Sequence, residues 1–270
     1  MMRSLIISIC LLIARGVIAQ DASAYYMVID GAPVYNYLIA EDFSGNGNDG
    51  TCSSANILEF VSGDWQGNFD GSSEYIQNGT NLFTSTEQGT FSAWVKLNSD
   101  IPNATSQTIM GFGGPDGATD PLLAMGIRKW AALGNIQYLD LTYADGNESG
   151  IDGVSGTTTV FTSGVWHHVA VTSDGSSYYL YLDGVPQSKA VWIGSDDGNW
   201  TADLAGKGVD FSAIGAGKYQ GSKGGYFDGL IKDVLEYDTE INATGIAAIY
   251  NGTNAPNSTV DITMQPKEVE

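Results

Sequence analysis

The chain carries, at residues 165–184, the stretch VWHHVAVTSDGSSYYLYLDG. Two runs rich in β-branched and aromatic residues flank Asp174-Gly175, and a second Asp-Gly pair follows the second run. Asp-Gly between such runs is a strong hairpin signal, because glycine supplies the positive φ that a tight turn requires. We therefore predict two antiparallel strands joined at Asp174-Gly175.

The rest of the composition is also typical of an all-β protein. The 270 residues include 35 Gly, and aromatic residues make up 11%. Residues 90–97 alternate cleanly between apolar and other side chains, with Phe91 and Val95 on one face, and residues 138–143 alternate too. Short strands separated by glycine-rich turns predict a sandwich or a barrel.

The ends of the chain differ from its middle. Residues 1–19 resemble a signal peptide, since Arg3 precedes a short apolar run and small residues lie before Gln20. We therefore expect a secreted protein with no membrane span or lipid anchor. Residues 20–253 are predicted to form one domain. Residues 254–270 are predicted to be a flexible C-terminal tail, because Pro, Asn and Thr are frequent there.

Charge and cysteine content limit the partners. The chain has 31 Asp+Glu against 11 Lys+Arg, a formal net charge of −20 at pH 7. Nucleic acids and anionic membranes are therefore poor partners. Removal of the signal peptide leaves Cys52 as the remaining cysteine, so no intrachain disulfide is expected.

Asn-X-Ser/Thr sequons occur more often than chance would place them, which favours a glycoprotein of a secretory pathway. The predicted glycosylation sites are Asn78, Asn103, Asn147, Asn199, Asn242, Asn251 and Asn257.

Several further segments accompany the hairpin in a fixed order. They are EDFSGNGNDG (residues 41–50), FDGSS (69–73), FSAWVKL (91–97) and FDGLIKDV (227–234), with a helical pattern ending at Tyr250-Asn251. Together with the hairpin they resemble the laminin G-like domains of the concanavalin A-like lectin/glucanase superfamily, over about residues 35–253. The resemblance implies a two-sheet antiparallel jelly-roll sandwich with a short C-terminal helix. It does not imply one activity, because this fold supports lectins, adhesion modules and glycosidases.

Two stretches depart from the family pattern, residues 113–128 and 187–210. Departures on a shared scaffold are where specificity usually lies. The second stretch predicts a sugar-binding platform, because aromatic faces stack on sugar rings and carboxylates bind hydroxyl groups. An alternative is that its indoles pack at the edge of the core. The candidate residues are Trp192, Asp196, Asp197 and Trp200.

A second candidate site lies on the concave sheet that the resemblance implies. Strand periodicity places Tyr138 and Asp140 on one face, and Trp130 precedes them. These three residues are predicted to line a ligand site.

The resemblance also implies a structural calcium ion. The turn at Asp42, Asn46 and Asn48 would supply oxygen ligands, and Asp233 would close the cage. The alternative is a hydrogen-bonded turn without a metal.

Two other groups resemble catalytic or metal sites. Glu236, Asp238 and Glu240 have the Glu-X-Asp-X-Glu spacing of some glucanases, but they lie in the last predicted strand of the domain rather than in a central one. His167 and His168 are adjacent on a strand, so they point to opposite faces and cannot bind one metal together.

We therefore expect a lectin-like module that binds glycans or extracellular glycoproteins, with calcium assisting. One alternative is a self-assembling structural subunit of an extracellular coat, filament or matrix. Another is a polysaccharide-cleaving enzyme. The sequence leaves the identity of the glycan and the oligomeric state open.

Overall fold

The computed structural model describes residues 26–27, 34–78, 85–115, 120–129, 136–146, 148–154, 161–253 and 260–269. Within these residues the chain is built from strands, with one helix, α2 (Ala243–Tyr250). No helix among them is long and apolar enough to cross a membrane. The predicted signal peptide lies outside the described residues.

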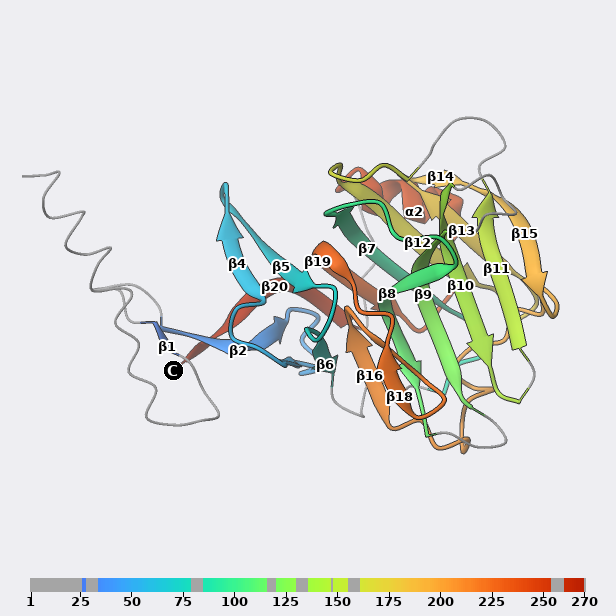
Figure 1. The fold of residues 1–270 in the computed structure, drawn as a ribbon, viewed down its shortest axis with the longest axis horizontal. Helices are drawn as coiled ribbons and strands as arrows, with labels where there is room; N and C mark the ends of the chain where they lie inside the picture. The colour runs from blue at the N-terminus through green and yellow to red at the C-terminus, as the bar shows by residue number, and fades with distance from the viewer. Residues whose placement is uncertain are drawn as a thin grey trace, which may run out of the picture.

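Two antiparallel layers form the body of the molecule (Figure 1). The first contains, in spatial order, β3 (Gly50–Cys52), β6 (Ile76–Asn78), β16 (Phe211–Ile214), β8 (Thr105–Gly113), β9 (Leu122–Lys129), β10 (Gln137–Ala144), β11 (Glu148–Val154) and β15 (Ser188–Ile193). The second contains β4 (Leu58–Val61), β5 (Asp64–Asp70), β19 (Asp228–Tyr237), β7 (Gly89–Leu97), β12 (His167–Ser173), β13 (Tyr178–Leu182) and β14 (Val185–Pro186).

The remaining strands connect or flank these layers. They are β1 (Tyr26–Met27), β2 (Val34–Asp42), β20 (Val260–Val269), β17 (Gly217–Tyr219) and β18 (Ser222–Gly224). Hydrogen bonding passes between the layers because β20 pairs with both β2 and β19. This arrangement confirms the predicted jelly-roll sandwich with a short C-terminal helix.

The hydrophobic core lies between the layers. The alternation predicted for residues 90–97 is confirmed in β7, where Phe91, Val95 and Leu97 are completely buried. In β10 the same pattern buries Leu139 and Leu141. Period-two alternation thus directs one face of each strand into the sandwich.

The helix covers the outer face of the second layer. Ile246 and Ile249 of α2 pack on Ala170 of β12 and Tyr237 of β19, the two strands on either side of β7. The Asn242 side chain caps the helix by accepting hydrogen bonds from the first turn of backbone N–H groups. The helix therefore shields part of the outer face of this layer from solvent.

The central hairpin forms as predicted, with β12 and β13 paired in register. Gly175 has a φ of 83°. The Asp174 carboxylate accepts the backbone N–H groups of Ser176 and Ser177 at 2.8 Å each. Asp174 and Gly175 therefore make the turn by the chemistry that the sequence indicates.

The C-terminal segment differs from the prediction of a flexible tail. Residues 260–269 form β20, in which Ile262 and Met264 are completely buried in the core. Both partners, β2 and β19, lie far away in sequence. Burial of the apolar side chains offsets the loss of chain entropy, although local composition indicates a mobile segment.

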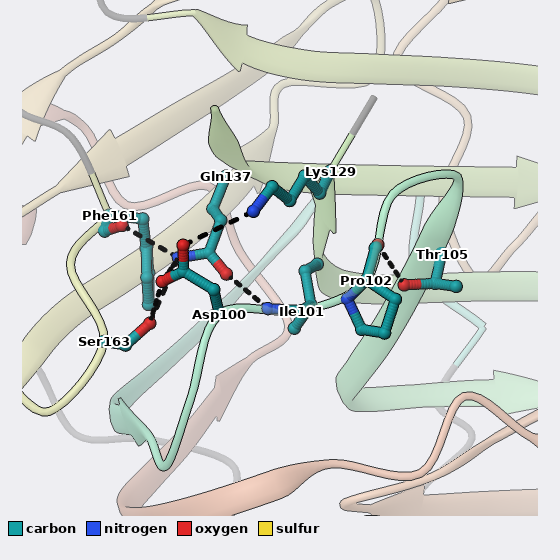
Figure 2. A network of polar contacts seen from close by, with 8 residues as sticks. All are labelled: Asp100, Ile101, Pro102, Thr105, Lys129, Gln137, Phe161 and Ser163. Carbon is teal, nitrogen blue, oxygen red and sulfur yellow. Dashed lines mark hydrogen bonds and ion pairs between the residues drawn. The ribbon is translucent and has the colours of Figure 1, made fainter. Parts of the chain in front are cut away.

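A polar network fixes the loops at one end of the layers (Figure 2). The buried Gln137 side chain accepts a hydrogen bond from the Ile101 N–H at 2.7 Å and donates to the Phe161 carbonyl at 3.1 Å. Asp100 contacts the same amide, the Ser163 hydroxyl and the Lys129 ammonium. One glutamine at the start of β10 thus joins two connecting segments, residues 100–101 and residues 161–163.

We predict that Gln137→Leu lowers the free energy of unfolding by about 2–3 kcal/mol, because it leaves buried backbone N–H and C=O groups without their partner. Urea unfolding would measure this loss. Thr105→Val is the control: it removes one exposed hydrogen bond to Pro102 and should cost less than about 1 kcal/mol. Equal losses in the two variants would contradict the assigned role of Gln137.

Candidate functional site

A pocket of about 530 Å³ lies on the outer face of the first layer. Its floor comes from β8, β9 and β10, one side from β15, and the other from the β17–β18 hairpin. The two stretches that depart from the family pattern both contribute to it, the first through β9 and the second through β15. The lining residues used below are Thr108, Gly126, Arg128, Asp140, Thr142, Trp192, Lys218, Tyr219 and Lys223.

Several small side chains line the floor of the pocket and leave space above the sheet. Leu122, Ala124 and Gly126 alternate along β9 on the pocket face, opposite Ala144, Thr142 and Asp140 of β10. A Cβ at Gly126 would lie 2.6 Å from the Gln107 carbonyl oxygen, so no side chain fits there without movement. Ala124, Gly126 and Ala144 thus leave space above the middle of this face.

Asp140 fixes one wall of the pocket. Its Oδ1 accepts a hydrogen bond from Trp192 Nε1 at 3.0 Å, and its Oδ2 accepts one from the Thr142 hydroxyl at 2.9 Å. The Arg128 guanidinium lies 3.7 Å from the centroid of the Trp192 ring. Asp140 and Arg128 are buried while Trp192 is 40% exposed, so the indole is held in place with part of its surface open to solvent.

The opposite wall is the β17–β18 hairpin. Gln220 and Gly221 make its turn with φ of 47° and 71°. The Thr108 N–H donates to the Gly225 carbonyl at 2.7 Å and joins the hairpin to β8. Tyr219 is 44% exposed at this wall, so a second open aromatic side chain lines the pocket.

Some of the ligand residues that the sequence predicts line the pocket, and others do not. Asp140 and Trp192, predicted as parts of two different sites, come together in this pocket. Tyr138 is buried and is not part of the lining. Trp130 lies outside the described residues.

The prediction for Trp200 is wrong. This indole is 1% exposed and packs on Phe91 at 4.8 Å between ring centroids, inside the core. A Cβ at Gly89 would lie 2.0 Å from Trp200 Nε1, so the glycine leaves room for the ring. The alternative of a core indole is correct for Trp200, whereas Trp192 faces the pocket.

Asp196 and Asp197 do not line the pocket either. Asp196 accepts the Tyr178 N–H at 2.8 Å and forms an ion pair with Lys189. Asp197 accepts a hydrogen bond from Ser195. The two carboxylates hold their own segment in place, so the sugar-contacting role predicted for them is not supported by this geometry.

The charged and aromatic lining residues that sequence reasoning missed are Arg128, Lys218, Tyr219 and Lys223. Arg128 lies in a stretch marked only as a departure from the family. The other three lie in a hairpin whose Gln-Gly turn gives a weak sequence signal.

The predicted calcium ligands form a hydrogen-bonded turn. Asp42 Oδ1 accepts the N–H groups of Ser44 and Asp261 at 3.0 Å, and Oδ2 accepts the Asn48 N–H and the Ser44 hydroxyl at 2.8 Å. Burial alone would raise the pKa of Asp42, but these hydrogen bonds lower it below its ordinary value. Four donors occupy the carboxylate, which does not fit a calcium cage of six to eight oxygens.

The other proposed calcium ligands do not alter this result. Asp233 lies in an irregular part of β19 with φ of 49°, and its carboxylate is 3.9 Å from Lys232 Nζ. The Asn46 side chain is exposed in the Asp42 turn. Among the described residues, no group of three or more His, Cys, Asp or Glu is placed to hold a metal.

The predicted glycosylation sites differ in exposure. Asn103, Asn242 and Asn251 are exposed, and Asn199 is half-buried. Asn78 is 3% exposed in β6, so a glycan there conflicts with the packing, and this prediction is not supported. Asn147 and Asn257 lie outside the described residues.

The glucanase-like triad is not assembled. Glu236 lies directly opposite Phe91 of the inner core, so its side chain points between the layers rather than to a sugar-binding surface. Asp238 and Glu240 follow the end of β19. Burial raises the pKa of Glu236 to about 8, with a smaller contribution from Asp238.

The two histidines have separate structural roles, as their adjacency predicts. His167 lies 2.9 Å from the Asp183 carboxylate, and its other ring nitrogen accepts the Thr162 N–H. His168 lies 2.9 Å from the Ser92 hydroxyl beneath α2, and burial lowers its pKa to about 4. Neither ring reaches the pocket.

The family model described as the concanavalin A-like lectin/glucanases superfamily matches residues 70–247, more than half of the chain. The chain belongs to this superfamily. Its membership confirms the resemblance seen in the hairpin and the accompanying segments. None of the curated proteins matches the chain in sequence.

Several solved structures share the superfamily fold. The CBM40 module of Ruminococcus gnavus IT-sialidase, bound to α2,3-sialyllactose, has a TM-score of 0.50 and 17% identity, covering 68% of this chain and 97% of that chain. Bacteriophage CBA120 tailspike protein 2, in its enzymatically active domain, has a TM-score of 0.53 and 14% identity, covering 79% and 32%. Domain 4 of AbnA, a GH43 extracellular arabinanase from Geobacillus stearothermophilus in complex with arabinotriose, has a TM-score of 0.49 and 19% identity, covering 78% and 86%. At these identities the likeness establishes the fold alone.

We predict that Trp200→Ala lowers the free energy of unfolding by about 3–5 kcal/mol, because it empties a large space in the core. Trp192→Ala should cost about 1 kcal/mol, since this indole is partly exposed at the pocket. Urea unfolding of both variants checks the difference. A loss for Trp192→Ala as large as that for Trp200→Ala would show that Trp192 is a core residue instead.

A second prediction concerns pH. Folded Glu236 stays protonated up to about pH 8, whereas the unfolded chain releases this proton near its ordinary pKa of about 4.3. The native state therefore binds more protons in this window, so stability falls as pH rises, by up to about 1.4 kcal/mol per pH unit. Glu236→Gln should remove this fall and become increasingly more stable than the parent between pH 5 and pH 8.

Urea unfolding at pH 5, 6.5 and 8 provides the measurement for Glu236→Gln. The exposed Glu87→Gln is the matched control, and its pH dependence should follow that of the parent. Parallel curves for all three proteins would show that Glu236 ionises in the folded state as it does in the unfolded chain.

Proposed function

We propose that this protein is a secreted carbohydrate-binding protein and that the sugar binds in the pocket over β8, β9 and β10. The observation that carries the proposal is the pair of exposed aromatic side chains, Trp192 and Tyr219, at the two walls of one pocket. Aromatic side chains stack on the apolar faces of sugar rings. Two aromatic side chains at opposite walls of a pocket suit a sugar ring better than they suit the flat surface of a partner protein.

The floor supplies groups that suit sugar hydroxyls. The side chains of Ser106, Thr108 and Thr142 line the pocket with hydroxyl groups, which both donate and accept hydrogen bonds. The small residues of β9 leave the floor open between them. A volume of about 530 Å³ falls in the usual range for small-molecule sites.

The mode of binding follows from this shape. Two aromatic contacts and a few hydrogen bonds give weak affinity at one site, so useful binding would depend on several sites acting together. The signal-like residues 1–19 support secretion, and the exposed sequons support glycosylation. Extracellular glycans or glycoproteins are the partners that fit this placement.

We predict that Trp192→Ala and Tyr219→Ala each weaken glycan binding about five- to tenfold by removing a stacking face. An array carrying sialylated, arabinan and neutral β-linked oligosaccharides would identify a ligand, and calorimetry would measure its affinity. Phe60→Ala is the control, because Phe60 is 58% exposed in β4, outside the pocket. Binding should be unchanged by a chelator, since the hydrogen bonds of Asp42 do not suit calcium.

One result would contradict carbohydrate binding, and another would change the expected role of calcium. A blank array with a folded protein would exclude a lectin-like role for the glycans tested. Regular assemblies on a sizing column would then favour a structural subunit of an extracellular coat, filament or matrix. Loss of binding with the chelator would instead restore the calcium prediction.

A further inference from the structure

We propose that the pocket selects glycans that carry an anionic group, a carboxylate or a sulfate. This inference rests on the proposed function and names the class of ligand for the same site. The reason is a local concentration of cations on a protein that is otherwise strongly acidic.

The charge of the lining is opposite to that of the chain. The protein has 11 Lys+Arg and a net charge of −20. The pocket lining nevertheless contains Arg128, Lys218 and Lys223, with Asp140 as the one carboxylate among the described lining residues. An even distribution of charge would make this surface negative.

The one lining carboxylate does not face a ligand. Asp140 is 4% exposed, and its two oxygens accept hydrogen bonds from Trp192 and Thr142. These two hydrogen bonds direct the Asp140 carboxylate toward the Trp192 N–H and the Thr142 hydroxyl and not toward the open space of the pocket. Of the three lining cations, Arg128 is buried against the Trp192 ring and Lys218 pairs with Asp210, so Lys223 supplies the exposed positive charge.

Two lysines face one another across the hairpin. Lys218 of β17 is the register partner of Lys223 in β18, so both side chains lie on the same face. Like charges directly opposite each other destabilise a strand pair. Asp210 offsets part of this repulsion by its ion pair with Lys218, and an anionic ligand beside Lys223 would offset more of it.

The two lysines differ in their partners. Lys218 forms an ion pair with Asp210 at 2.6 Å. Lys223 donates to the Tyr75 hydroxyl and lies over the rings of Tyr75 and Phe211, at 4.2 and 5.0 Å from their centroids. No carboxylate of the described residues forms an ion pair with Lys223, whose ammonium has three hydrogens to donate.

The overall negative charge does not prevent this selection. At physiological ionic strength the screening length is about 8 Å, so the remote carboxylates act weakly on a bound group. The lysines of the pocket act at contact distance, where charge-assisted hydrogen bonds are strong. Local charge therefore decides which glycan binds.

Matched glycan pairs test this inference. The pairs are 3′-sialyllactose with lactose, a glucuronic acid-terminated disaccharide with its glucose-terminated counterpart, and 6-sulfated N-acetyllactosamine with the unsulfated sugar. We expect the acidic member of at least one pair to bind about tenfold more tightly than the neutral member. The pair that shows the difference distinguishes a carboxylate from a sulfate.

Three variants assign the selection to the lysines. Lys223→Gln should reduce the acidic preference about tenfold. Asp210→Asn, which removes the counter-charge of Lys218, should increase it about two- to fivefold. Lys267→Gln removes one positive charge in β20, outside the pocket, and should leave the preference unchanged. Thermal unfolding would verify that all variants are folded.

The outcomes separate the two proposals. Neutral glycans bound as tightly as acidic ones, or an acidic preference that survives Lys223→Gln, would overturn the anionic selection and leave the carbohydrate-binding function in place. Absence of binding to both members of every pair would reject the carbohydrate-binding function, and the selection with it.

Discussion

The pairing of β19 with three other strands is the constraint on which the rest of this structure depends. One edge of β19 pairs with β7, and the other pairs first with β5 and then with β20. The change of partner coincides with a register shift and with the left-handed conformation of Asp233. Because β20 also pairs with β2, β19 links β20 and β2 to β7, and β7 in turn pairs with β12 of the central hairpin. Figure 1 shows this arrangement. Both inner faces can then bury a continuous core.

The residues that line the pocket are not the residues that form the hydrophobic core. The core needs the inward-facing residues of β8, β9 and β10, whereas the pocket uses the alternate positions of the same strands. Small and polar residues can occupy those outer positions without loss of core packing. The hairpin β17–β18 and the edge strand β15 add the walls. Of these two, β15 belongs to a stretch that departs from the family pattern, and the other such stretch supplies β9 of the floor.

Acidic residues have different roles in different places. Asp42 and Asp174 organise turns by accepting backbone hydrogen bonds, Asp140 positions an indole, and Glu236 is buried and protonated in the core. The composition of the chain indicates a uniformly acidic molecule. Three of its 11 Lys and Arg residues nevertheless lie in the lining of one pocket, where Asp140 is the one carboxylate among the described lining residues.

The sequence by itself determined the strand pattern, the central hairpin, the family and the inner faces of β7 and β10, because alternation and turn chemistry act between neighbouring residues. It also singled out Asp140 and Trp192, since aromatic and carboxylate side chains stand out in a strand. Only the tertiary structure decided that Trp192 is open while Trp200 is buried, that residues 260–269 form a strand, and that Lys218 and Lys223 join Arg128 in one pocket. Those outcomes depend on contacts between residues far apart in the chain, and such contacts have no signature in local sequence.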